Sequence, residues 1–295
     1  MQTKHLGILF IIPAILAKVD INIVASDNEA ERAAEVAGNI VDIISDEERS
    51  SFGISDNSLK NAVGTYFGKR PDDAFVRSPT PWGDLYKSYN WDQVTRILTP
   101  VRATILNVTS QPTIVMNQVF HNNSTRTATF KAQIQQKVQN TITSKWEKGG
   151  DLTVGQSIEY GIKVEAVSVS GKTSMSYSSQ WGKSVSKAEA VSVGSESGVQ
   201  ITLEPNQEVI AELYATRGTM QIKVDYEATL SGDTAINYGR TYKGHHFWAL
   251  GINDVMRAAD ISTSISSSEI ISVGYYTRSN VVIRDGGVIL KSIDV

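Results

Sequence analysis

The stretch at residues 152–166 reads LTVGQSIEYGIKVEA, and apolar and polar residues alternate along most of it. Successive side chains of a β-strand point to opposite faces of the sheet, so this period of two residues predicts a strand with one apolar face. The apolar positions are even-numbered, among them Ile158, Tyr160, Ile162, Val164 and Ala166.

The same alternation returns after a turn signal at Ser170-Gly171, now with the apolar residues at odd positions. A two-residue turn there predicts that Val164 lies opposite Tyr177, with both side chains on the apolar face. A shift of one residue would move the apolar set of one strand to the other face, so the register is well specified. We therefore predict one long amphipathic β-hairpin over residues 150–193.

A hairpin of this kind fits two settings, and the alternation alone leaves both open. It can lie half-buried on a sheet of its own protein. Alternatively, it can cross a membrane in a β-barrel, whose strands need about 9–11 residues and alternate lipid-facing with lumen-facing side chains. One hairpin cannot close a barrel, so several copies of the chain would each contribute one. The predicted lipid-facing residues are Ile158, Tyr160, Ile162, Val164, Ala166, Val167, Val169, Met175, Tyr177 and Trp181. The predicted lumen-facing residues are Glu159, Lys163, Glu165, Ser174, Ser176 and Ser178.

The composition excludes several classes of protein. The chain has 295 residues, 41% of them hydrophobic, which is enough for a sizeable core. Its net charge of −3 provides no basic footprint, so no nucleic-acid partner is predicted. Cysteine is missing altogether, which excludes disulfides, thiolate nucleophiles and cysteine-bound zinc.

The N-terminus predicts a secreted, extracellular protein. Lys4 precedes an apolar run, LGILFIIPAIL, and Ala17 is a small residue suited to a cleavage point. This pattern is typical of a signal peptide over residues 1–17, and a buried strand or helix is the alternative. The run is too short for a transmembrane helix, which needs about 20 apolar residues. Glycans on a secreted chain would be attached at the Asn-X-Ser/Thr sites Asn107, Asn122 and Asn123.

The chain changes character at about residue 100. Helical spacing predicts helices at 26–50 and 56–67, and residues 68–93 form a loop-rich stretch of prolines, glycines and aromatics. We predict that residues 18–100 are a helical, aromatic-rich recognition region; a minor core is the other use for these rings. The candidate receptor-binding or surface-binding residues are Trp82, Tyr86, Tyr89 and Trp91.

Residues 101–295 are dominated by Thr, Val, Ile, Ser and Tyr in strand-like runs, including separate candidate strands at 101–109 and 112–121. Several of the predicted strands are longer than the usual five or six residues. The fold class predicted for the chain is mainly β, elongated, with long antiparallel strands and short helices in its N-terminal part.

No enzymatic site is predicted. Residues 170–173 read SGKT and mimic the end of a phosphate-binding loop, but position 166 is Ala where that motif requires Gly. His245 and His246 are adjacent, so on a strand they point to opposite faces and cannot bind one metal ion together. We therefore predict no catalytic residues, no metal and no cofactor.

Two further stretches resemble a known family. Residues 117–130 read NQVFHNNSTRTATF and residues 198–206 read GVQITLEPN; both look like parts of the pore-forming module of aerolysin-like toxins. The resemblance is to the epsilon-toxin and mosquitocidal-toxin type and covers roughly residues 100–295. It implies an elongated β pore-forming module at 101–295 that contains the insertion hairpin 150–193.

The same resemblance implies a function. Members bind a lipid membrane, through a glycan or a protein receptor, then form a homo-oligomer and insert their hairpins as one transmembrane β-barrel. The N-terminal third departs from the bacterial toxins and is similar to slime-mould spherulin and insect follicular yolk proteins. A non-lytic structural or storage protein of eggs or coats is therefore the alternative function, and a carbohydrate-binding, lectin-like module is the third.

Overall fold

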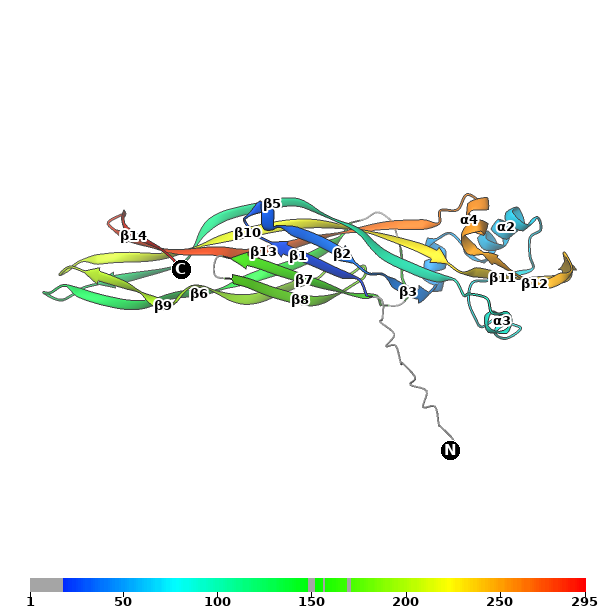
Figure 1. Ribbon diagram of the computed structural model, residues 1–295, viewed down its shortest axis with the longest axis horizontal. Coiled ribbons are helices and arrows are strands. Elements are labelled where there is room, and N and C mark those ends of the chain that lie inside the picture. The colour runs from blue at the N-terminus through cyan, green and yellow to red at the C-terminus, as the bar shows by residue number, and fades with distance from the viewer. Residues whose placement is uncertain (1–17, 148–151, 156, 169–170) are drawn as a thin grey trace, which may run out of the picture.

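The computed structural model describes residues 18–147, 152–155, 157–168 and 171–295. The chain forms a long rod of β-strands with a small mixed head at one end (Figure 1). The C-terminus lies in the half of the rod away from the head, and the first described residues lie near its middle. The predicted signal peptide, residues 1–17, lies outside the described residues.

One long sheet forms the body of the rod. Its strands are hydrogen-bonded in the order β3, β5, β10, β13, β6 and β9, and β14 pairs with β13. Their bounds are β3 (Ile40–Ile43), β5 (Thr95–His121), β10 (Glu208–Ser231), β13 (Ser264–Asp285), β6 (Ala128–Trp146), β9 (Ser186–Leu203) and β14 (Val288–Asp294). β5 stays paired with β10 over its whole length because three register shifts absorb its extra residues. The strands predicted separately at 101–109 and 112–121 are therefore one strand.

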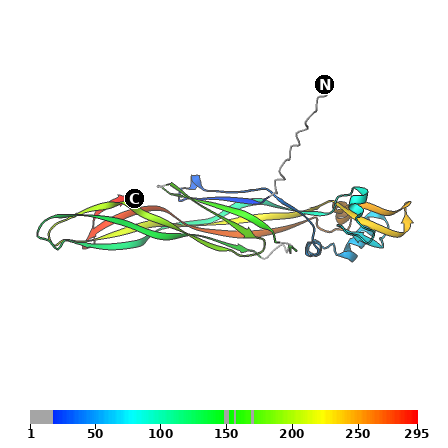
Figure 2. The same ribbon diagram turned by 90° about the horizontal axis from the view of Figure 1, so that it is seen from below.

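A second sheet lies along the middle of the rod as a separate layer (Figure 2). Its strands follow the order β2 (Ala33–Ala37), β1 (Asp20–Ala25), β7 (Glu159–Ser168) and β8 (Gly171–Gln180). Its inner face shares one hydrophobic core with the long sheet, and Ile23 and Val164 belong to the same buried cluster as Val224 and Val273. All four side chains are almost fully removed from water, which stabilises the contact between the layers.

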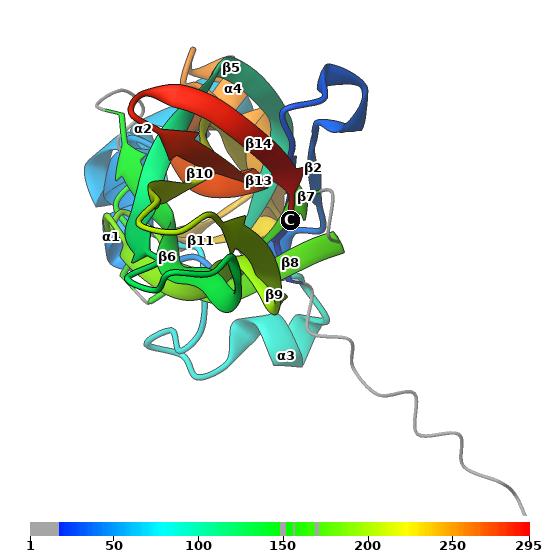
Figure 3. The same ribbon diagram turned by 90° about the vertical axis from the view of Figure 1, so that its left-hand side faces the viewer.

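The end of the rod away from the head has its own core. Seen along the axis, the long strands follow a curved arc (Figure 3). Each of five strands sends apolar residues into this second core, represented by Phe120, Ile134, Ile201, Leu213 and Val281. Curling lets a single sheet cover its own apolar face at this end.

The head combines a small sheet with short helices. The sheet order is β12 (His245–Gly251), β11 (Asp233–Tyr242) and β4 (Asp73–Phe75). The helices are α1 (Asp46–Ser51), α2 (Asp56–Phe67), α3 (Leu85–Tyr89) and α4 (Ile252–Ala258). α2 confirms the helix predicted at 56–67: Leu59 and Val63 are buried, and the chain leaves at Gly68 with a φ of 92° that favours glycine.

The helix predicted at 26–50 is wrong. The segment instead holds a one-turn 3-10 helix, η1 (Glu29–Glu31), the strands β2 and β3, and the start of α1. β2 pairs with β1, and β3 pairs with β5. Backbone pairing with strands elsewhere in the chain outweighs the helical spacing of a few alanines and isoleucines, because helix propensity is a weak preference.

Candidate functional site

β7 and β8 form the predicted hairpin, but it is shorter than predicted and its register differs. The antiparallel pairing runs from Ser168 with Gly171 to Glu159 with Gln180, and Val164 lies opposite Met175 rather than Tyr177. The register is shifted by two residues, which preserves the face of every side chain. Residues 169 and 170 lie between the paired ends and outside the described residues.

The hairpin ends where the predicted second strand breaks. Trp181 donates its backbone N–H to the Ile158 carbonyl at 2.9 Å, and Gly182 follows with a φ of 72°. From Ser186 onward the chain pairs with β6 in the long sheet instead. The predicted span 150–193 is therefore two segments in different sheets, and the hairpin proper is 159–180.

The apolar face of the hairpin is buried, and its polar face is exposed to solvent. The apolar face turns toward the long sheet, and the residues buried there are Ile158, Tyr160, Ile162, Val164, Ala166, Met175 and Trp181, with Tyr177 half-buried. The outer face is polar; Glu159, Lys163, Ser174, Ser176 and Ser178 are exposed, and Glu165 is half-buried. The side chain of Val167 and the whole of Val169 lie outside the described residues.

The N-terminal strand β1 holds the hairpin by its backbone. β1 runs parallel to β7, and six residue pairs join them, from Asp20 with Gly161 to Ala25 with Ala166. β8 is the outer strand of this sheet, so the hairpin joins the sheet through β1, and the apolar core packs against its inner face. No local sequence signal pointed to this contact, because parallel pairing joins segments far apart in the chain.

A buried carboxylate lies where the hairpin meets the long sheet. Glu269 on β13 is fully buried, and its Oε2 accepts hydrogen bonds from the hydroxyls of Tyr160, at 2.8 Å, and Tyr226, at 3.0 Å. Burial raises the pKa of Glu269, although these hydrogen bonds act to lower it. Sequence reasoning missed this residue, yet it shares the strand parity of the apolar residues Ile271 and Val273, and that was a usable signal.

Aromatic rings surround this carboxylate. Trp146 of β6, which lies opposite Glu269 in the ladder, has its ring 4.4 Å from that of Trp181 and 5.4 Å from that of Tyr226. Burial raises the pKa of Tyr160 and of Tyr226, and the negative charge of Glu269 adds to the effect. The tyrosines are therefore neutral hydrogen-bond donors throughout the physiological pH range.

A second candidate site is an aromatic patch on the head, which we define as Phe75, Trp82, Tyr89, Trp91 and Phe247. The Trp82 ring lies 5.2 Å from Phe247 and 6.0 Å from Phe75, and Tyr89 stacks on Trp91 at 4.7 Å. Trp82 and Tyr89 are 44% and 51% exposed, so both present much of their ring area to solvent. Phe75 and Phe247 were not among the residues predicted for surface binding; the fold brings them next to Trp82.

The structure contradicts a surface-binding role for Tyr86. Its side chain is buried, and its hydroxyl donates to the carbonyls of Phe75, at 2.8 Å, and Asp233, at 3.1 Å. The residue ties α3 to the head sheet. Spacing along the chain could not separate it from its exposed neighbours, because α3 is a single short helical turn.

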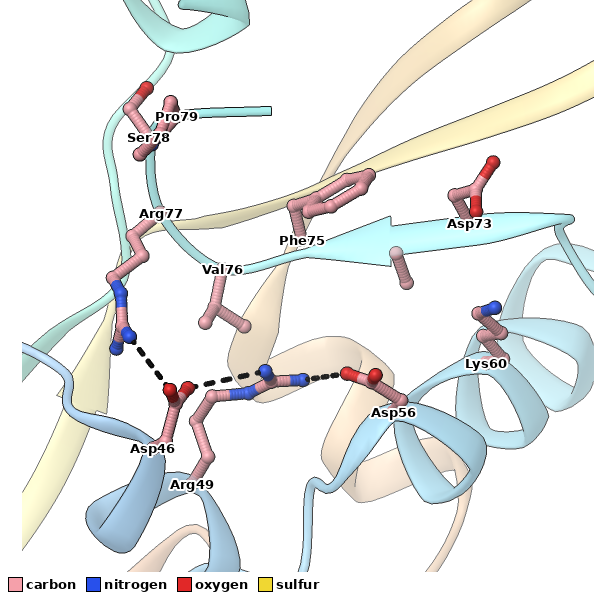
Figure 4. A pocket seen from close by; sticks show the side chains of 11 residues that line it. Asp46, Arg49, Asp56, Lys60, Asp73, Phe75, Val76, Arg77, Ser78 and Pro79 are labelled. Carbon is pink, nitrogen blue, oxygen red and sulfur yellow. Dashed lines mark hydrogen bonds and ion pairs between the residues drawn. The ribbon is translucent and has the colours of Figure 1, made fainter. Parts of the chain in front are cut away.

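The head also contains a charged pocket of about 350 Å³ between α1, α2 and β4 (Figure 4). Arg49 bridges two carboxylates in it, at 3.6 Å from Asp46 and 2.8 Å from Asp56, and Arg77 lies 3.1 Å from Asp46. These opposite charges are already paired with one another. The pocket is therefore a salt-bridged joint between elements of the head.

A family model described as Clostridium epsilon toxin ETX/Bacillus mosquitocidal toxin MTX2 matches residues 86–288. The chain belongs to this family. U-megalopygitoxin(8)-Mc8 of Megalopyge crispata is 38% identical over 286 residues, which cover 97% of this chain and 98% of that protein. U-megalopygitoxin(8)-Mo15 of Megalopyge opercularis is 35% identical over 257 residues, covering 87% and 81%.

The fold agrees with this membership. The solved structure of parasporin-2, a Bacillus thuringiensis toxin that recognizes cancer cells, matches with a TM-score of 0.62 at 17% identity. The match covers 87% of this chain and 100% of that one. The predicted family resemblance and the predicted elongated, mainly β fold are both confirmed. Membership of this toxin family supports a pore-forming toxin at the level of the family.

The three predicted glycosylation sites differ in the exposure of their asparagine side chains. Asn107 and Asn123 are exposed, and glycans there stay a prediction. A glycan at Asn122 is contradicted, because its side-chain nitrogen is buried and donates to the carbonyls of Arg126, Leu203 and Glu204 at 2.8–3.0 Å. Asn122 holds the turn between β5 and β6 against the end of β9.

Among the described residues, no group of three or more His, Asp or Glu side chains is placed to bind a metal ion. Within the same residues, none of the helices has the length and apolar character needed to span a bilayer.

Proposed function

We propose that this chain is a secreted toxin that perforates membranes by releasing the β7–β8 hairpin and inserting it. The observation that carries the proposal is the hairpin itself: two strands of ten residues each, apolar on one face and polar on the other, held as a separate layer. Strands of about 9–11 residues are long enough to cross the hydrocarbon core of a bilayer.

Insertion would exchange one apolar environment for another. The face that now packs on the long sheet would turn to lipid, so its side chains stay out of water in both states. Glu159, Lys163, Glu165, Ser174, Ser176 and Ser178 would then line a polar lumen. An isolated hairpin leaves backbone groups unpaired at both edges, which lipid does not tolerate, so insertion requires a homo-oligomer that closes a barrel.

Liposomes loaded with dye test the proposal directly. The protein is added with and without prior trypsin treatment, over several lipid compositions and pH values, and release is followed by fluorescence. We expect release that depends steeply on protein concentration, because several chains form one pore. No release under any of these conditions would contradict the proposal and favour the non-lytic structural or storage protein, whose hairpin stays packed.

Substitutions on the outer face of the hairpin should change the ion preference of the pore. Each copy would add Lys163 to a ring of lumen charges, so Lys163→Glu replaces a positive ring by a negative one. In planar bilayers under a salt gradient, the reversal potential should shift toward the value expected for a cation-selective pore. Lys131→Glu, an exposed lysine on β6 outside the hairpin, should leave it unchanged. Equal shifts in both variants would argue against a lumen position for Lys163.

The aromatic patch on the head is our proposed surface-binding site, for a glycan, a protein receptor or lipid headgroups. We expect Trp82→Ala and Tyr89→Ala each to weaken binding to susceptible membranes by about tenfold or more, as loss of an exposed aromatic anchor does. Tyr66→Ala is the matched control, because Tyr66 is a 44% exposed tyrosine of the head outside the patch. Sedimentation with vesicles or cells measures binding, and a glycan array with the same variants tests the lectin-like reading. Unchanged binding by both patch variants would place recognition elsewhere.

A further inference from the structure

Glu269 occupies an unusual place for an acidic residue. It points from β13 into the contact between the long sheet and the hairpin, with no measurable exposure to solvent. One of the two hydroxyls that bond its Oε2 comes from the hairpin, Tyr160, and the other comes from the body, Tyr226. Its other oxygen, Oε1, is buried, and the Ser144 hydroxyl faces the carboxyl group from β6. Removal of the hairpin would therefore take away one of the two tyrosine hydrogen bonds to Oε2 and open the site to water.

No positive charge among the described residues compensates this carboxyl group. The titratable groups that face it are tyrosines: Tyr160 from β7, Tyr177 from β8 and Tyr226 from β10. From β6 it faces the hydroxyl of Ser144 and the ring of Trp146. Charged residues one position away on the neighbouring strands lie on the opposite face of the sheet, where Lys223 pairs with Glu147 at 3.1 Å and with Asp225 at 3.7 Å.

Further hairpin hydroxyls collect at the same contact. The Tyr177 hydroxyl and Ser179 Oγ on β8 are both buried, and the Ser179 side chain lies against the Tyr160 hydroxyl. Ser179 is the residue directly opposite Tyr160 in the hairpin. The polar atoms are thus concentrated around one carboxyl group within an otherwise apolar interface, which makes the protonation state of that group matter for the whole contact.

We propose that Glu269 is a protonation-dependent latch on the hairpin: the protonated side chain holds the hairpin against the body, and the ionised side chain loosens it. The latch regulates the insertion step and in that sense rests on the proposed function. With the proton in place, Oε2 still accepts both tyrosine hydrogen bonds and no charge is buried. Without it, the same bonds remain, but a negative charge lies in an apolar site with no counter-ion.

The direction of the pH effect follows from linkage. Burial raises the pKa of Glu269 in the packed state, whereas an exposed glutamate after release titrates near its ordinary value of about 4.3. The packed state therefore binds the proton more tightly than the released state does. Its extra stability is fully present below the ordinary pKa and is lost as the pH rises through the raised one. Acid holds the hairpin in place, and neutral or alkaline pH favours its release.

Hydrogen exchange in solution, without any membrane, tests the latch. Backbone amides of the hairpin are followed from pH 5 to pH 8 in the wild type and in Glu269→Gln, an uncharged side chain of the same shape. Dividing the wild-type rate by the Glu269→Gln rate at each pH cancels the intrinsic pH dependence of exchange. We expect the ratio to rise with pH by up to about tenfold per unit and then to level off, because one proton is released. A ratio that stays constant over this range overturns the proposal.

An internal reference separates the latch from a general change in stability. Amides of β5 and β10 around Ala211 and Gly218 belong to a different part of the long sheet, and their exchange ratio should not depend on pH. An equal rise there would overturn the latch. Should Glu269→Gln fail to fold, hairpin amides are compared with these reference amides within the wild type, after each rate is divided by that of an unstructured peptide.

A matched pair of tyrosine variants tests which bond the hairpin loses. Tyr160→Phe and Tyr226→Phe each remove one hydroxyl from the same carboxyl oxygen. Only the Tyr160 bond breaks on release, so Tyr160→Phe should speed hairpin exchange several-fold more than Tyr226→Phe does. Equal effects would count against the latch. Because exchange is read without lipid, a pH-dependent ratio in a protein that never leaks dye would support the latch and reject the pore, and the reverse result would do the opposite.

Discussion

Joining Asn22→Cys on β1 to Lys163→Cys on β7 by a disulfide is expected to suppress dye leakage by roughly 100-fold, limited by the fraction of molecules left unbridged. The two residues are direct partners in the parallel ladder, and Lys163 is on the exposed face. Adjacent strands lie about 4.7–4.9 Å apart, within the Cα separation that a disulfide spans. The natural chain has no cysteine, so no other bridge competes. A reductant should restore leakage.

The control for this lock uses the same position. Lys163→Cys with Ser176→Cys joins β7 to β8 across a directly paired position on the exposed face. That bridge lies inside the hairpin, which is proposed to move as a unit, so leakage should match that of the wild type in both redox states. If the oxidised β1–β7 bridge leaks as fast as its reduced form, the hairpin does not need to leave β1 and the proposed route is wrong.

The alternation at 152–166 predicted the sidedness of the hairpin because parity is a local property of an extended chain. The alternation could not determine which residues of the two strands lie opposite each other. A shift of two residues leaves every side chain on its face, so apolar patterning does not distinguish Val164 opposite Met175 from Val164 opposite Tyr177. That choice depends on the turn geometry, and the Ser170-Gly171 signal placed the turn one residue too late.

Long-range contacts are the other limit of the sequence. β1 lies parallel to β7 and β2 completes that sheet, although no residue in 18–37 signals a partner near residue 160. The same contacts convert part of the predicted helix 26–50 into strand. Burial also separates residues that look alike in the sequence, since Tyr86 supports the head from inside while Tyr89 stands on its surface. Glu269 could have been singled out from the sequence, because it is an acidic residue at a strand position whose neighbours on the same face are apolar.

Replacement of Arg96 by Leu is expected to lower the free energy of unfolding by about 3–5 kcal/mol, the usual effect of removing one partner from a buried ion pair. Arg96 is 2% exposed where β5 leaves the head. Its guanidinium lies 2.8 Å from the Glu48 carboxylate and 2.6 Å from that of Asp42, and donates to the Ile40 carbonyl at 3.0 Å. Without it, the buried carboxyl group of Glu48 loses its counter-ion.

Arg102→Leu is the matched control for this change, with urea denaturation followed by tryptophan fluorescence as the measurement. Arg102 stands on the same strand and also lies 2.8 Å from a carboxylate, Asp225, but its side chain is 71% exposed. Water and salt screen that pair, so little or no change in stability is expected. Equal losses in the two variants would show that burial is not what makes Arg96 matter.

The double variant Arg96→Leu with Glu48→Gln distinguishes two causes of the lost stability: the missing interactions of Arg96 and the unpaired charge of Glu48. Glu48 Oε2 also accepts the backbone N–H of Ser45 at 2.7 Å, and a glutamine oxygen can keep that cap on α1. If the single variant is unstable mainly because it leaves a buried charge unpaired, the double variant should recover much of the loss. If it recovers nothing, the hydrogen bonds from Arg96 to β3 and α1 are what join the head to the rod.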